Sequence, residues 1–309
     1  MDIKIENLTK KFGGQRAVDN ISFEVKTGEI LGFLGPNGAG KTTTMRIITN
    51  YLLPTEGEIY IGGKSLRDHS EELKKHIGYL PENNPLYSDM PVIDYLEFVA
   101  ALQGIPKDKT TERIAEMVRI CGLNAEKHKK IGELSRGFRQ RCGLAQAMIN
   151  DPDILILDEP TSGLDPNQIV EIRKLIRELG KEKTVILSTH ILPEVEATCD
   201  RILIIDNGKI VADGTANTLK KQSKGQEVVV VRIEDGDPNA IFEAIRELPS
   251  VALVDFVDRQ QNRFEIQSHP GSSSPRAIFD LCVKKKWVLT ELTPFETKLE
   301  DIFRDLTTN

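Results

Sequence analysis

The sequence predicts an α/β fold with a central parallel sheet between helices, followed by a smaller α+β domain. Three observations lead to this prediction. Continuous apolar runs, typical of parallel strands that helices cover on both faces, occur at 154–157, 185–187 and 202–205. A glycine-rich segment, 35–42, separates the apolar run 30–34 from a helical pattern. Beyond a polar stretch at 220–226, strand and helix patterns alternate again.

The first elements follow from periodicity. Residues around Ile3 and Ile5, and around Ile21, Phe23 and Val25, alternate between apolar and polar, which predicts half-exposed antiparallel strands. The run 30–34 predicts a buried strand. The helix that follows is expected over 43–53, because its apolar residues share one face: Met45, Ile48 and Leu52.

Later elements follow in the same way. Helical spacing predicts a helix through Ile169, Ile172, Ile176 and Leu179. Asn207-Gly208 and Asp213-Gly214 bracket a short strand and predict tight hairpins. We expect 220–226 to be a linker, so the predicted domains are 1–220 and 221–309.

The second domain has the pattern of two βαβ halves, which predicts a ferredoxin-like sheet. Its expected elements, in order, are strand 226–233, helix 239–248, strands 251–257 and 262–267, helix 274–285, strand 287–293 and helix 295–305. It has no cluster of metal-ligating residues, and we expect a scaffold or interaction module.

Net charge, hydropathy and cysteine spacing exclude several classes of function. The net charge is -6, which argues against a general nucleic-acid binder, so no nucleic-acid partner is expected. No stretch approaches about 18 consecutive apolar residues, so any membrane partner has to be a separate chain. The cysteines lack a CxxC spacing, which favours reduced thiols in the cytoplasm; they are Cys121, Cys142, Cys199 and Cys282.

The glycine-rich segment has the full pattern GxxxxGKT of a phosphate-binding loop. Backbone N–H groups of such a loop converge on phosphate oxygens, and the helix N-terminus adds partial positive charge. Lys41 is expected to neutralise the outer phosphates, and the hydroxyl of Thr42 to bind Mg²⁺. The sequence therefore predicts a nucleotide triphosphate site.

Two adjacent carboxylates end the apolar run 154–157. Neighbours on a strand point to opposite sides, so Asp158 and Glu159 are expected to have different roles. Asp158 is placed to hold Mg²⁺, and Glu159 to act on a water in line with the γ-phosphate. A strand end that merely precedes Pro160 is the alternative.

A third motif spans 134–141. Ser135 is a good N-cap, and Ser135 and Gly137 can present hydroxyl and N–H groups to an anion. We expect this second anion site to complete the nucleotide site of another copy of the chain. Taken alone, the motif favours an ordinary capped helix.

Taken together, these motifs resemble the ATP-binding subunits of ABC transporters over residues 1 to about 220. The segments that carry the resemblance are the phosphate loop, 134–140, 154–160, Ser162-Gly163-Leu164-Asp165 and Ser188-Thr189-His190. Within that family the chain resembles the ATPases of ABC-2-type exporters. More narrowly, 78–87 and 139–147 resemble the gliding-motility-associated ATP-binding subunit.

The resemblance implies ATP and Mg²⁺ as cofactors and a head-to-tail dimer of two copies that drives a separate membrane permease. It places the protein peripherally at the cytoplasmic face of the inner membrane. It implies adenine contacts at Phe12 and Val18, a switch histidine at His190 and coupling between sites at Asp165. A core Phe is the alternative for Phe12. The implied phosphate contacts are Gly35, Pro36, Asn37, Gly38, Ala39, Gly40, Lys41, Thr42 and Thr43, with Ser135 and Gly137 from the partner copy.

Two residues depart from the family pattern. Glu82 stands where glutamine is usual; it is expected near Mg²⁺ and adds negative charge beside the phosphates. Arg136 replaces a glycine and is expected to point to solvent; a cation that faces the nucleotide of the partner copy is the alternative. Two other functions compete with transport: a soluble ABC-type switch in translation or DNA repair, and a small-molecule kinase. The kinase leaves the motifs at Ser135 and His190 without a role.

Overall fold

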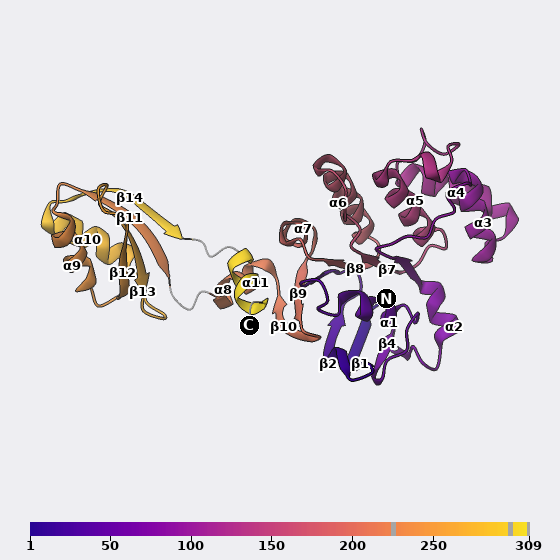
Figure 1. The fold of residues 1–309 in the computed structure, drawn as a ribbon, viewed down its shortest axis with the longest axis horizontal. Helices are drawn as coiled ribbons and strands as arrows, with labels where there is room; N and C mark the ends of the chain where they lie inside the picture. Colours follow the sequence, from indigo (N-terminus) through magenta and orange to yellow (C-terminus); the bar gives the residue numbers. More distant parts are fainter. Residues whose placement is uncertain (224–226, 296–298, 308–309) are drawn as a thin grey trace. The chain divides into compact units, whose positions relative to one another are not determined.

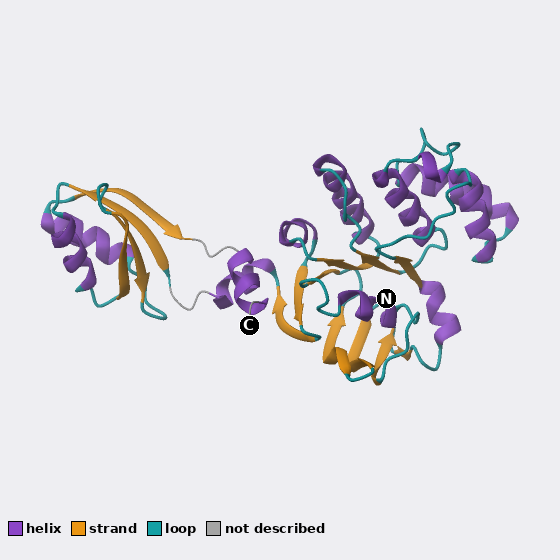
Figure 2. Ribbon diagram, in the orientation of Figure 1, coloured by secondary structure: helices purple, strands orange, loops and turns teal. Residues whose placement is uncertain are grey.

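The computed structural model describes residues 1–223, 227–295 and 299–307. The chain forms two compact units, one of residues 1–216 with the C-terminal end from 305, the other of residues 217–304. The division falls slightly before the predicted boundary at 220. The mixture of helices and strands in both units is visible in Figure 2.

The first unit is built on a six-stranded sheet whose strand order is β10-β9-β3-β8-β7-β6. All neighbouring strands are parallel except β10, which runs antiparallel to β9. The strands are β3 (Ile30–Leu34), β6 (Ile77–Leu80), β7 (Ile154–Asp158), β8 (Thr184–Thr189), β9 (Arg201–Asp206) and β10 (Lys209–Gly214). The apolar runs thus form central parallel strands, as predicted.

Alternation along β7 explains why its apolar run is continuous. Ile154 and Ile156 pack into one core, with α1 (Lys41–Ile48) and an antiparallel sheet. Leu155 and Leu157 pack into another core, with the helices on the opposite face of the sheet. In Figure 1, α6 and α7 lie on one side of this sheet and α1 on the other. A strand covered on both faces requires apolar residues at successive positions.

The antiparallel sheet of the first unit has the order β2-β1-β4-β5. Its strands are β1 (Ile3–Phe12), β2 (Gln15–Val25), β4 (Glu56–Ile61) and β5 (Lys64–Ser65). The alternation predicted for β1 and β2 is confirmed, because Ile3, Ile5 and Ile21 are buried between exposed or partly buried neighbours.

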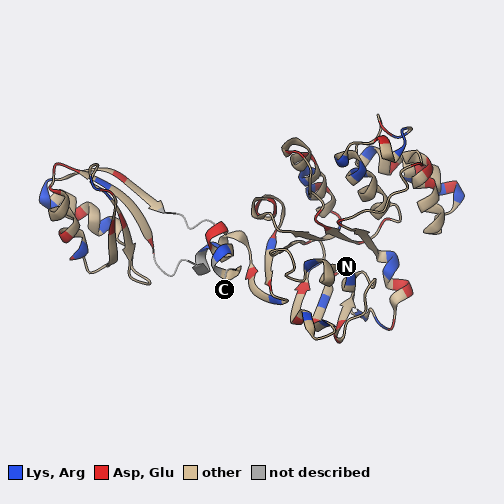
Figure 3. Ribbon diagram, in the orientation of Figure 1, with Lys and Arg blue, Asp and Glu red and all other residues tan. Residues whose placement is uncertain are grey.

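A helical region and further helices complete the first unit. The apolar faces of α3, α4 and α5 share one core with β7 and β8. Lys, Arg, Asp and Glu are interspersed along these helices (Figure 3). The helices are α2 (Ser70–Leu73), η1 (Lys74–His76), α3 (Val92–Leu102), α4 (Lys107–Ile120), η2 (Ile131–Glu133), α5 (Arg136–Met148), α6 (Pro166–Gly180) and α7 (Leu192–Thr198). The next helix, α8 (Ala216–Ser223), begins at the last residue of this part of the first unit and continues in the second unit.

The second unit is a four-stranded antiparallel sheet with the order β12-β13-β11-β14. This is the order of a ferredoxin-like split βαβ fold. Alternate residues of β11, such as Val229 and Val231, pack against Ile241 of α9 and Ile278 of α10. The elements are β11 (Val228–Glu234), α9 (Pro238–Arg246), β12 (Val251–Asp258), β13 (Arg263–Ser268), α10 (Pro275–Lys285), β14 (Val288–Phe295) and α11 (Leu299–Thr307).

Three local predictions need correction. The helix expected over 43–53 ends at Ile48, because Asn50 takes a left-handed φ of 55°. Asn207-Gly208 turns the β9–β10 hairpin, but Asp213-Gly214 ends β10 without a second hairpin. The expected linker is helical up to Ser223, and 224–226 lies outside the described residues. The start of the last predicted helix, at 296–298, also lies outside them.

The four cysteines are free thiols. Burial raises the pKa of Cys121 and of Cys142 to about 12, and it raises the pKa of Cys199 and Cys282 as well. They therefore remain protonated and unreactive at neutral pH. Across the described ranges, no helix combines the length and apolar character that a membrane crossing requires.

Candidate active site

The phosphate-binding loop connects β3 to α1 and depends on glycine at two positions for steric reasons. A Cβ added to Gly35 would lie 2.4 Å from the carbonyl oxygen of Ile205. A Cβ added to Gly40, whose φ is 108°, would lie 2.4 Å from the carbonyl oxygen of Ala17. The loop is therefore packed against the backbone of its neighbours, and its N–H groups are available at the start of α1.

Lys41 is the first residue of α1 and is almost fully buried. Its ammonium donates to the carbonyl oxygens of Gly35, at 2.8 Å, and Pro36, at 3.2 Å. The same Nζ lies 3.5 Å from Oε1 of Glu159. The lysine is thus held at the loop by several oxygens, each weaker as a partner than a phosphate would be.

Asp158 ends β7 and is completely buried. Its Oδ1 accepts hydrogen bonds from Thr42 Oγ1, at 3.2 Å, and from the hydroxyl of Ser188. Its Oδ2 is buried without a hydrogen-bond partner among the described residues. Burial raises the pKa of Asp158, while the hydrogen bonds from Ser188 and Thr42 oppose that rise.

These groups fit Mg²⁺. This ion prefers hard oxygen ligands, and it is usually held by one or two carboxylates together with waters and substrate phosphates. The hydroxyl of Thr42 and the unpartnered oxygen of Asp158 supply such ligands beside the phosphate loop. Within the described ranges no group of three or more His, Cys, Asp or Glu forms a metal cage, so phosphate oxygens would have to complete the coordination.

Glu159 and His190 form a pair at the adjacent ends of β7 and β8. Glu159 has a φ of 50°, an uncommon value for a residue other than glycine. Its backbone N–H donates to both the carbonyl and the hydroxyl of Ser188, each at 3.1 Å. His190 Nδ1 lies 2.9 Å from Oε2 of Glu159. The carboxylate of Glu159 thus contacts both Lys41 and His190.

One cleft of about 420 Å³ is lined by half of the predicted site residues. Two of its lining residues, Ala17 and Ser162, were not predicted, and Ser188 behind it was also missed. A serine at the end of the otherwise apolar β8 was a signal for the latter. The predicted residues that line the cleft are Asn37, Gly38, Gly40, Lys41, Thr42, Thr43, Glu82, Glu159 and His190. Ala39 is buried behind the loop.

The two residues expected to contact adenine differ in their exposure. Phe12 is 52% exposed at the end of β1, with Lys10 Nζ 5.3 Å from the ring centroid, so its ring is accessible. Val18 is completely buried in the core with β1 and β3 and offers no surface to a ligand. The expected contact of Val18 with adenine therefore needs correction. Side chains alternate along β2, so Val18 points into the core and its neighbour Ala17 lines the cleft.

Ser135 and Gly137 do not line the cleft that contains Lys41. Ser135 caps α5, and its Oγ accepts from the N–H of Phe138 at 3.3 Å, as predicted for an N-cap. Asp165 caps α6 in the same way, accepting from the N–H groups of Asn167 and Gln168. Capping of α5 and α6 is by itself sufficient to explain why a serine and an aspartate occupy positions 135 and 165. That Asp165 couples the two nucleotide sites of a dimer stays a prediction.

Arg136 does not simply extend into solvent. A Cβ added to Gly163 would lie 2.3 Å from Cζ of Arg136, so the guanidinium packs on the backbone that follows Ser162. The residue is exposed nonetheless. The expectation for Arg136 is therefore wrong in part, since the side chain connects the start of α5 to the Ser162–Asp165 loop.

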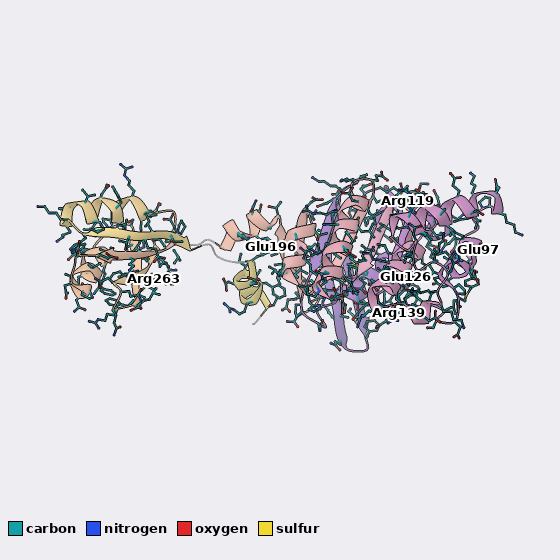
Figure 4. The ribbon with its side chains drawn as sticks, turned by 90° about the horizontal axis from the view of Figure 1, so that it is seen from above. Glu97, Arg119, Glu126, Arg139, Glu196 and Arg263 are labelled. Carbon is teal, nitrogen blue, oxygen red and sulfur yellow. The ribbon has the colours of Figure 1, made fainter. Side chains whose placement is uncertain are left out.

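A second cleft, of about 510 Å³, adjoins the first because Glu82 lines both. It extends over 82–86 to the first turns of α5, where Arg139 donates to the carbonyl oxygen of Leu134. Arg139 is labelled in Figure 4. Nearby, the ring of Tyr87 is 56% exposed and lies edge-to-face on Phe98, with centroids 5.6 Å apart.

Comparison with known proteins gives this site its context. The sequence pattern of the ABC transporter family matches residues 18–162. The ABC transporter ATP-binding protein YxlF of Bacillus subtilis is 36% identical over 97% of this chain and 98% of its own. The chain belongs to the family of ABC transporter ATP-binding proteins. It is also 35% identical to the Nod factor export ATP-binding protein I of Ralstonia nicotianae, over 75% of this chain and 73% of that protein.

Solved ABC structures share the fold of the first unit. The ATP-binding cassette MJ0796, a dimer in a post-hydrolysis state with ADP and Pi, has a TM-score of 0.63 and 27% identity, covering 69% of this chain and 98% of its own. The protein cbiO1 of Clostridium perfringens, part of the transporter complex cbiONQ, has a TM-score of 0.66 and 29% identity, covering 80% and 95%. The protein is thus an ABC ATPase with ATP and Mg²⁺ as cofactors.

Proposed function

We propose that this chain powers a separate integral membrane permease of the ABC-2 exporter type from the cytoplasmic face of the inner membrane. The similarity to a Nod factor export ATP-binding protein supports the exporter class. Gliding motility as the physiological setting is the narrowest part of this proposal. It depends on the resemblance of 78–87 and 139–147 alone.

The observation that carries the proposal is the separation of two anion-binding features. The cleft contains the phosphate loop, Glu159 and His190, but Ser135 and Gly137 do not line it. Two copies that pack head to tail bring Ser135 of each copy to the triphosphate of the other. The MJ0796 dimer provides a precedent for pairing within this fold. ATP and dimerisation then stabilise each other by linkage.

Each residue of the cleft has a distinct role in this mechanism. Lys41 and the loop N–H groups hold the outer phosphates, and His190 donates to the γ-phosphate. Mg²⁺, held by Thr42 and Asp158, would offset charge on the phosphoryl group that is transferred. Glu159 accepts a proton from the attacking water, and the hydrogen bond with His190 fixes the direction of its carboxylate.

Mixing inactive variants tests the head-to-tail arrangement. Lys41→Ala removes the phosphate contact of one copy, and Ser135→Asp keeps an N-cap while it places a negative charge before the other triphosphate. Each variant alone should lose ATPase activity. A mixture should regain activity, because one of the two sites in a mixed dimer combines intact halves. The matched control mixes Lys41→Ala with Glu159→Gln, which damage the same half and should not complement.

No recovery in the first mixture, with mixed dimers present, would contradict the head-to-tail site. Recovery of activity in the control mixture would contradict the head-to-tail site equally. It would mean that Lys41 and Glu159 of one copy serve two different nucleotide sites. Mixed dimers can be verified by pulling down a tagged copy.

We further propose that the permease docks on residues 82–95, which form the loop after β6 and the first turn of α3. The exposed aromatic pair Tyr87 and Phe98 and the cleft beside Glu82 support this placement. An aromatic contact at a groove is a common anchor in interfaces. A photo-crosslinker at position 87 should label a coexpressed permease. If the crosslinker never labels a membrane protein, this loop is not the docking site. If the chain, coexpressed with a candidate permease, does not copurify with membranes, the result favours a soluble switch.

A further inference from the structure

A buried carboxylate lies behind the site, outside the cleft. Glu194 is in α7 and is only 2% exposed. Its Oε2 accepts hydrogen bonds from Thr161 Oγ1, at 2.7 Å, and from Thr189 Oγ1, at 2.9 Å. The partly exposed Glu196, labelled in Figure 4, lies on the same helix.

The two threonines lie next to the reacting pair: Thr161 is in the loop that follows β7, and Thr189 is the last residue of β8. Thr161 lies two residues after Glu159, and Thr189 directly precedes His190. The ladder between β7 and β8 ends with the pair Asp158 and Ser188. Beyond that pair, Glu194 provides a bridge between the loops that is independent of the Glu159–His190 contact itself.

This bridge is costly as packing alone. A buried carboxylate requires hydrogen bonds, and Oε1 of Glu194 has no partner within the described ranges. An apolar side chain would fill the same space without that penalty. The carboxylate does provide a single oxygen that accepts from both hydroxyls. Thr189 Oγ1 in turn accepts from the N–H of Ile191, at 3.0 Å, so the bridge reaches the backbone on the far side of His190.

We propose that Glu194 is a positioning residue for ATP hydrolysis, which fixes the loops of Glu159 and His190 relative to each other through Thr161 and Thr189. The inference rests on the proposed roles of Glu159 and His190. Without the bridge the two side chains remain present but lose their alignment. Displacements of about 1 Å in such arrangements reduce rates by up to ~100-fold.

Steady-state ATPase assays on full-length variants test this. Glu194→Ala and Thr161→Val should each lower kcat by about tenfold without changing the Kd for MgATP, because the phosphate loop is untouched. Glu194→Gln should retain most of kcat, since its amide oxygen can accept from both hydroxyls. The matched control is Thr198→Val, since the Thr198 hydroxyl is buried on the same helix and has no hydrogen-bond partner among the residues that the structure describes. This control should leave kcat unchanged.

A double-mutant cycle separates positioning from general destabilisation. Because Glu194 acts through His190, adding Glu194→Ala to His190→Ala should lower kcat by less than it does in the wild type. Equal effects in both backgrounds would overturn the inference, as would a kcat loss in Thr198→Val as large as in Thr161→Val. A wild-type kcat in Glu194→Ala and Thr161→Val, with His190→Ala impaired, would overturn it while leaving the proposed function intact. Wild-type activity in His190→Ala would instead contradict the proposed function.

Discussion

Lys41 and Glu159 form an ion pair inside the cleft, with Nζ 3.5 Å from Oε1 and with side chains 6% and 7% exposed. The same carboxylate contacts His190. A triphosphate that binds the loop competes with Glu159 for the ammonium, since phosphate oxygens carry more charge. Nucleotide binding thus frees one side of the carboxylate for the attacking water while His190 retains the other.

Replacing Glu159 by Gln should lower kcat by about 100-fold or more while MgATP still binds, because the amide cannot accept the proton. ATP should then accumulate in a closed dimer. Size-exclusion chromatography with ATP and Mg²⁺, and filter binding of labelled ATP, can measure both effects. A Glu159→Gln variant with wild-type turnover would remove Glu159 from the role of base.

Stability should depend on pH through Asp158. Because the folded pKa is raised above the ordinary 3.8, the folded protein holds a proton that the unfolded chain releases. This contribution is fully present below pH 3.8 and is lost as pH rises through the raised pKa. Urea unfolding in EDTA should therefore show that wild type loses stability relative to Asp158→Asn as pH increases. A pH-independent difference between the two would contradict the raised pKa.

Two glycines of the loop should respond differently to alanine. At Gly35 the new Cβ would meet a backbone oxygen at 2.4 Å, so we expect a loss of about 3 kcal/mol and of ATP binding. Gly38 has a φ of 83° and open space, so alanine there should cost only about 1 kcal/mol. Chemical denaturation compares the pair. Equal costs would show that the loop can move away from β9.

Glu82→Gln should strengthen ATP binding in the absence of metal, because a carboxylate beside the phosphates is removed. The exposed position limits the gain to a few-fold. With excess Mg²⁺ the gain should shrink, since the cation already offsets the charge. Isothermal titration in EDTA and in Mg²⁺ measures both values. Unchanged affinity in EDTA would mean that Glu82 stays away from the phosphates.

Deleting 222–309 should change the ATPase rate or the monomer–dimer equilibrium, because we expect the ferredoxin-like unit to add a dimer contact or to regulate closure. Analytical ultracentrifugation and a coupled assay provide the two readouts. The unit has its own core around Phe264 and Ile266. The deletion also removes the C-terminal end from 305, which belongs to the first unit, but the two hydrophobic cores of the first unit use residues no later than Ile210. If the ATPase rate and the monomer–dimer equilibrium are the same in the full-length and the deleted protein, the ferredoxin-like unit has neither role.

Much of the fold was predictable because local patterns and tertiary context agree. β7 and β8 are covered on both faces, so burial alone produces their apolar runs. Strand order in the second unit followed from two βαβ halves. Chain reversals were less predictable: Asp213-Gly214 has a turn composition, yet Gly214 still belongs to β10 and pairs with Ile202 of β9. The helix after the phosphate loop ends early because Asn50 has a left-handed φ. The periodicity of the apolar residues gives no sign of this backbone conformation.

The site was predictable where its chemistry is confined to a motif. Lys41, Thr42, Asp158 and Glu159 were found because their spacing along the chain reflects their function. Contacts between distant segments had no such signal. The placement of Val18 in the core depends on which face of β2 is covered, and the packing of Arg136 on Gly163 depends on how α5 meets the following loop.

The buried thiols make the protein convenient for labelling experiments. Maleimides attack thiolates, which the native cysteines hardly form at neutral pH. A cysteine introduced at an exposed site, such as position 87, should therefore be modified selectively in the otherwise unaltered chain. Distance measurements between spectroscopic probes on two copies then become possible without first removing the natural residues.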